Sequence, residues 1–82
     1  MTDDLSTWGS IIDGLGGTVA AAEGLSQLKS VVSGWRERGI PSAHWSAVVR
    51  LAAERGNEEI TLEVLADLAA RRRALLIAEA RA

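Results

Sequence analysis

Residues 26–38 read SQLKSVVSGWRER, a segment that combines large apolar residues with small and polar ones. Three large apolar residues recur in it at spacings of four and three: Leu28, Val32 and Trp35. Residues at this spacing lie on one side of a helix. The opposite side carries small or polar residues: Ser30, Ser33, Gly34 and Glu37. The pattern predicts a helix that packs on its neighbours through one side and presents a small polar surface on the other.

The chain has 82 residues, which is enough for one domain whose single core is only marginally stable on its own. It contains no cysteine and one histidine, His44, so we expect no disulfide, no metal site and no cofactor. Oligomerisation is the remaining means of adding stability. Although 48% of the residues are apolar, three tryptophans are the only aromatic residues that can give the core bulk: Trp8, Trp35 and Trp45.

Charge is distributed unevenly along the chain. The net charge is −2, whereas nucleic-acid binders usually carry a basic surplus. Residues 1–28 contain four acids and no lysine or arginine, and residues 29–55 contain five bases and two acids. The local basic surplus therefore begins within the polar-faced helix predicted above.

The N-terminal third predicts two helices separated by glycines. The first is expected to start at a Thr2 cap followed by two acids, and its apolar face comprises Leu5, Trp8, Ile12 and Leu15. It should stop at Gly16-Gly17, where positive φ costs no strain. Thr18 is expected to cap a short second helix, Val19 to about Glu23, whose three alanines permit a close helix crossing.

The C-terminal half predicts two further helices. Pro41 is expected to open the first, whose apolar face is Trp45, Val48, Val49 and Ala52 and which ends at Arg55-Gly56-Asn57. Thr61 should cap the last helix, which meets no breaker from Leu62 onward and can run for about 20 residues, or about 30 Å. Its packing positions on the body are Leu62, Leu65, Leu68 and Ala69.

The end of the last helix is predicted to pair with a second copy of the chain. After Arg71-Arg72-Arg73, apolar residues follow one another through residues 74–78, and four earlier helices leave little surface to cover them. The residues assigned to dimerisation are Leu68, Arg72, Leu75, Leu76 and Ile77. We therefore expect one domain over residues 1–82, with a core in 1–60 and a dimerising helix in 61–82.

Residues 18–38 resemble the helix-turn-helix element of the Cro and YdaS-like regulators of phages and prophages. With Thr18 counted as first, the packing positions hold suitable residues: Ala22 fifth, Val32 fifteenth and Trp35 eighteenth. The ninth position is usually a left-handed glycine; here it is Ser26, and Gly24 is an alternative place for the break. Gly16-Gly17-Thr18 before the element, WRERGIP over residues 35–41 after it, and Trp45 look like small regulators of the carph-isopro kind. The resemblance covers about residues 11–68.

Together with the long last helix predicted above, this resemblance implies an all-α, lambda-repressor-like fold of about five helices. It also implies that the start of the second helix of the motif enters the major groove of double-stranded DNA. The residues expected to contact base edges are Gln27, Lys29, Ser30 and Ser33. Those expected to contact phosphates are Thr18, Arg36 and Arg38. Glu37 either accepts a hydrogen bond from cytosine or forms a salt bridge with a neighbouring arginine.

The function predicted is sequence-specific transcription regulation, by a homodimeric repressor that binds a palindromic operator in the cytoplasm, at the nucleoid. The alternative is an adaptor that binds another protein through the same surface or through the last helix, and the acidic net charge favours it. No catalytic constellation, small-molecule site or membrane span is apparent in the sequence, so an enzyme is the poorest hypothesis. In the plainer interpretations, the serines and residues 71–73 are solvated helix faces, Trp35 and Trp45 are core residues, and His44 lies at the surface.

Overall fold

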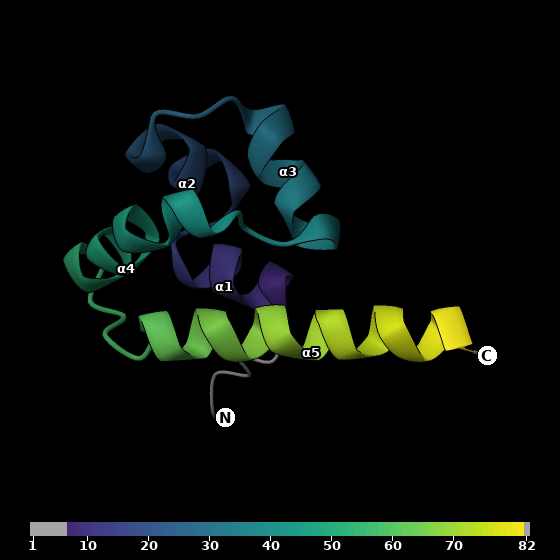
Figure 1. The fold of residues 1–82 in the computed structure, drawn as a ribbon. Coiled ribbons are helices and arrows are strands. Elements are labelled where there is room, and N and C mark those ends of the chain that lie inside the picture. The colour runs from purple at the N-terminus through teal and green to yellow at the C-terminus, as the bar shows by residue number, and fades with distance from the viewer. Residues whose placement is uncertain (1–6, 82) are drawn as a thin grey trace.

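A computed structural model of the chain describes residues 7–81, with the side chain of Arg81 excepted, and its regular secondary structure is all helical (Figure 1). It contains five α-helices and one short 3-10 helix, with no strand between residues 7 and 81. The elements are α1 Trp8–Gly14, α2 Thr18–Leu25, α3 Lys29–Arg38, η1 Ser42–His44, α4 Trp45–Glu54 and α5 Leu62–Arg81. The expected all-α fold of about five helices with a long C-terminal helix is confirmed. The predicted Thr2 cap and the position of Leu5 lie outside the described residues.

Residues from all five helices share one apolar core. Its fully buried side chains include Ile11, Ile12, Leu15, Val32, Val48, Ile60 and Leu65. The prediction that tryptophans give the core its bulk is confirmed for Trp8 and Trp35, which are buried. Trp45 is half-buried and packs against the core cluster. Figure 1 shows α1 between the α2–α3 pair and α5, which runs along one edge of the molecule.

Helix α1 is closed at both ends by local sequence signals. At its start, the Ser10 amide donates to Thr7 Oγ1 at 3.0 Å and the Thr7 amide donates to Ser10 Oγ at 3.2 Å, which forms a reciprocal capping box. After it, Gly16 and Gly17 have φ values of 104° and 99°, a region that favours glycine. The predicted break at this glycine pair is confirmed.

The start of α2 differs from the prediction. Gly17, not Thr18, is the N-cap residue, and Thr18 is the first residue of the helix. Gly17 adopts positive φ there, so the helix begins one residue earlier than a threonine cap would allow. The hydroxyl of Thr18 instead accepts a hydrogen bond from the Arg36 Nε–H at 3.0 Å.

The turn between α2 and α3 is made by Ser26, which adopts the left-handed conformation with φ 55° and ψ 44°. Ser26 therefore occupies the conformation usual for glycine at the ninth position, and the alternative break at Gly24 is wrong. Gly24 lies inside α2, where a Cβ would come within 2.7 Å of two methyl carbons of Leu51. Its lack of a side chain allows α2 to pack closely on α4.

Helix α3 is anchored by two of its three predicted apolar residues. Val32 is 0% exposed and Trp35 is 6% exposed, and the third packing position of the resemblance, Ala22, is buried as well. Leu28 is 72% exposed, contrary to the prediction. It precedes α3 as an N-cap residue in extended backbone, so helical spacing does not determine where it lies.

The loop after α3 is held by tryptophans. Gly39 has φ 93°, and a Cβ there would lie 2.9 Å from Trp8 Nε1, so the loop can approach the indole only with glycine. Trp45 Nε1 donates to the Ile40 carbonyl at 2.7 Å. Pro41, expected to open the helix that carries Trp45, is instead the N-cap residue of η1, and α4 itself begins at Trp45.

Helix α5 spans 20 residues and begins at Leu62 as predicted, and Thr61 Oγ1 accepts the Val64 amide at 3.3 Å. Leu65 and Leu68 are buried, but Leu62 is 51% exposed and does not pack on the body as expected. The C-terminal turns of α5 extend past the other helices (Figure 1), and Leu75, Leu76 and Ile77 are exposed. No helix in the described range combines the length and apolar character that crossing a bilayer would require.

Candidate nucleic-acid interface

The starts of α2 and α3 enclose a shallow, open surface depression of about 480 Å³. Its lining residues are Thr18, Val19, Lys29, Ser30 and Ser33. Four of these five were predicted from the sequence to contact DNA; Val19, 52% exposed, was missed. Lys29, Ser30 and Ser33 are all exposed, so the polar side of α3 is accessible to a second molecule.

The depression lies where two helices begin without side-chain caps. Gly17 precedes α2 and Leu28 precedes α3, and neither supplies a capping hydrogen bond from its side chain. The first amide groups of a helix have no partner within the helix and carry its partial positive charge. Both helix starts therefore add to the positive character that Lys29 gives this surface.

Gln27, another predicted base contact, lies in the turn before α3 and is half-buried. Its backbone N–H donates to the Ala22 carbonyl at 2.9 Å, which ties the turn back to α2. Gln27 therefore borders the start of α3, although it is not part of that helix.

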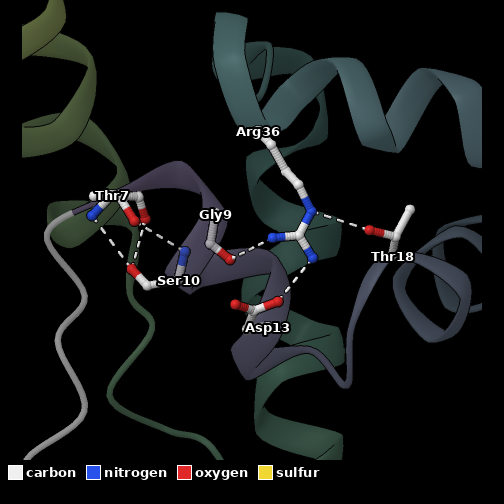
Figure 2. A network of polar contacts seen from close by, with 6 residues as sticks. All are labelled: Thr7, Gly9, Ser10, Asp13, Thr18 and Arg36. Atoms are coloured by element: carbon white, nitrogen blue, oxygen red, sulfur yellow. Dashed lines mark hydrogen bonds and ion pairs between the residues drawn. The ribbon is translucent and has the colours of Figure 1, made fainter.

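Arg36 joins three parts of the fold (Figure 2). Its Nε–H donates to Thr18 Oγ1 at 3.0 Å, its Nη1 to the Gly9 carbonyl at 3.3 Å and its Nη2 to Asp13 Oδ1 at 2.7 Å. The last contact is also an ion pair. This network ties the second half of α3 to α1 and to the first residue of α2.

These contacts give Arg36 a role other than the predicted phosphate contact. Each of its nitrogens donates inside the domain, and the guanidinium sets how α3 lies on α1. The Thr18 hydroxyl accepts from Arg36 and therefore retains its own hydrogen for donation toward the depression. Sequence reasoning missed Asp13 and Gly9 as partners, because they lie 23 and 27 residues from Arg36 and no local pattern links them.

Arg38 is the exposed arginine at the end of α3. Its guanidinium lies over Gly34, where a Cβ would collide with it. The space beside Gly34 is therefore occupied by a side chain of the same helix. Glu37 is exposed, and in the part of the chain that the structure describes no ion pair joins it to Arg36 or Arg38.

A second hollow, which we call the α5 groove, lies between the end of α3 and the middle of α5, with a volume of about 570 Å³. Trp8, Trp35 and Leu76 contribute apolar surface to it, and its arginines are Arg38, Arg72 and Arg73. Arg72 Nη1 donates to the Glu37 carbonyl and so links α5 to the end of α3.

The structure divides the residues assigned to dimerisation. Leu68 is 5% exposed and belongs to the core of its own chain, which leaves it no surface for a second copy. Leu75, Leu76 and Ile77 are 65%, 53% and 47% exposed. These three residues remain available to a partner.

The site contains no arrangement that points to metal chemistry. Within the described residues, no three or more histidine, cysteine, aspartate or glutamate side chains are grouped so that they could hold an ion. No model of a protein family matches the chain, and neither the curated proteins nor the solved structures gave a significant match.

Proposed function

We propose that this protein is a sequence-specific DNA-binding transcription regulator, a repressor that binds a palindromic operator as a homodimer in the cytoplasm, at the nucleoid. The observation that carries the proposal is the open depression lined by Thr18, Lys29, Ser30 and Ser33. The sequence predicts that these residues contact DNA, and they lie together at one accessible surface. The likeness to Cro and YdaS-like regulators rests on the sequence positions alone.

In the proposed complex, α3 lies in the major groove with its anchored side turned away from the duplex. Lys29 donates to a guanine edge, and Ser30 and Ser33 donate to or accept from neighbouring bases. Val19 offers an apolar contact to a thymine methyl group. Arg38 and the Thr18 hydroxyl bind phosphates and fix the register. A repressor needs nothing further, since occupation of a promoter excludes polymerase.

The decisive experiment measures binding to genomic DNA fragments that the purified protein retains, as a function of salt. A protein that neutralises several phosphates loses affinity with a log–log slope of about −0.9 per phosphate. Lys29→Ala with Ser33→Ala is expected to relax sequence preference, and Arg38→Ala to weaken all fragments alike. Arg71→Ala, an exposed arginine on α5, is the matched control and should leave retention unchanged. If retention is the same for all four proteins, the site assignment is wrong.

A second candidate function is an adaptor that binds another protein through this surface. Exposed apolar side chains beside the depression favour it, since Val19 is 52% and Leu28 is 72% exposed. The net charge of −2 favours it as well. An adaptor would retain no specific DNA fragment, and its partner binding would depend little on salt. Leu28→Ala would then weaken binding more than Lys29→Ala.

A further inference from the structure

The body-facing row of α5 continues beyond the body. Residues at spacings of three and four form this row, which runs from Leu65 and Leu68 through Arg72 and Leu76 to Glu79. Leu65 is 0% and Leu68 is 5% exposed, whereas Leu76 is 53% exposed. The face that α5 buries at Leu65 and Leu68 is partly covered at Arg72, which donates to the Glu37 carbonyl, and is exposed at Leu76. We call residues 72–80 of α5 the overhang.

Two of the three charged residues of the overhang, Arg72 and Glu79, are placed so that they can pair with the same residues of a second copy. Arg72 and Glu79 lie seven residues apart, which is two helical turns, so both are on the body-facing row. Leu75 and Leu76 lie between them. If a second overhang runs antiparallel about a two-fold axis between positions 75 and 76, each Arg72 lies opposite Glu79 of the other copy. A parallel pair would instead place like charges together.

We propose that the overhang is the dimer interface, occupied by the overhang of a second copy in this antiparallel register. The proposal deepens the proposed function, from which it takes the homodimer. Two Arg72–Glu79 pairs flank a centre of Leu75 and Leu76 from both copies, as expected for an isologous interface. Arg72 donates to the Glu37 carbonyl through Nη1, and its Nε and Nη2 remain available for the pair.

The α5 groove supports a partner of this chemistry. Leu76 and Arg72 lie in its wall, and Arg38 and Arg73 add two further positive charges. A second overhang brings apolar side chains to this hollow together with the carboxylate of Glu79. An unrelated acidic peptide would satisfy the arginines of the groove but would be repelled by Glu79. A second copy supplies a carboxylate for Arg72 and a guanidinium for Glu79.

The test is the mass of the full chain in solution, measured by sedimentation over a range of concentrations without DNA. Glu79→Arg places arginine opposite arginine twice and is expected to weaken dimerisation about tenfold or more. Arg72→Glu does the same with two carboxylates. Mixing these two variants restores both pairs, so an equimolar mixture should dimerise as the wild type does. Glu63→Arg and Arg71→Glu reverse exposed charges outside the row and serve as matched controls.

The proposal is overturned if the wild type is monomeric throughout, or if Glu79→Arg dimerises as well as Glu63→Arg. If Arg72→Glu loses helix content because its contact with Glu37 is lost, neutral variants replace it. Glu79→Gln alone should then weaken the dimer as much as Glu79→Gln combined with Arg72→Gln.

Binding to a half-site duplex separates the dimer proposal from the proposed DNA-binding function. A Glu79→Arg monomer that still binds the half-site through Lys29 supports the DNA function, whereas a stable dimer that binds no duplex contradicts that function alone.

Discussion

Helices α3 and α5 each bury one side in the same core, but their exposed surfaces have opposite chemistry. The exposed side of α3 carries Lys29, Ser30 and Ser33, which can exchange hydrogen bonds with water for hydrogen bonds with a polar partner. The exposed half of α5 carries Leu75, Leu76 and Ile77. Covering these side chains with another apolar surface is favourable, because it removes them from water. One small domain thus presents two surfaces suited to different partners. Each can be altered separately from the core that both helices share.

The largest effect is expected at the anchor of α3. Trp35 is 6% exposed and its ring lies 5.0 Å from that of His44, so Trp35→Ala removes a large buried aromatic side chain. Such truncations cost about 3–5 kcal/mol, a large part of the stability of a domain this size. Urea unfolding followed by circular dichroism measures the loss. Ser33→Ala, on the exposed side of the same helix, should change the free energy of unfolding by less than about 0.5 kcal/mol.

The same contrast applies along α5. Leu65 is 0% exposed, and Leu65→Ala should lower the free energy of unfolding by about 2–5 kcal/mol. Leu75 is 65% exposed, and Leu75→Ala should change it by less than about 0.5 kcal/mol at protein concentrations too low for dimerisation. Equal losses at the two positions would mean that the second half of α5 packs on the body of its own chain.

Sequence reasoning succeeded where the signal is local. The Gly16-Gly17 break and the Thr61 cap each depend on a few adjacent residues whose backbone preferences decide the conformation. It failed at Leu28, which has helical spacing from Val32 but precedes the first residue of α3. It also failed to place the end of the packed part of α5, because that point depends on where the other helices end.

In the candidate site too, some residues could be predicted from a local pattern and others depend on partners from elsewhere in the chain. Lys29, Ser30 and Ser33 follow from the amphipathic pattern of α3, and the structure places them together. Arg36 belongs to the same helix and has the same charge as Arg38, yet it is held inside the domain because Asp13 and Thr18 happen to face it. Sequence patterns distinguish charged from apolar residues, but not a solvated arginine from one paired across the fold.

Replacing Arg36 is expected to change the free energy of unfolding less than replacing Trp35 or Leu65. Hydrogen bonds to charged groups contribute about 1.5–3 kcal/mol, but the Arg36 and Asp13 side chains are 32% and 67% exposed, so solvent screens their pair. We therefore expect Arg36→Ala to lower the free energy of unfolding by about 1–2 kcal/mol. Arg38→Ala should change it by less than about 0.5 kcal/mol. Asp13→Asn combined with Arg36→Ala should cost little more than Arg36→Ala alone, and a fully additive loss would contradict the network.

The smallest effect concerns the uncapped start of α3. Leu28 is an exposed N-cap residue without a capping hydrogen bond, so Leu28→Asp should supply a cap and raise the free energy of unfolding by about 0.5–1 kcal/mol. The same carboxylate faces the proposed DNA and neutralises the helix start, so DNA binding should weaken while stability rises. Thermal unfolding and fragment retention measure the two quantities on one protein. Because a folding defect cannot raise stability, opposite changes would locate the nucleic-acid surface at the start of α3, whereas unchanged retention would place that surface elsewhere.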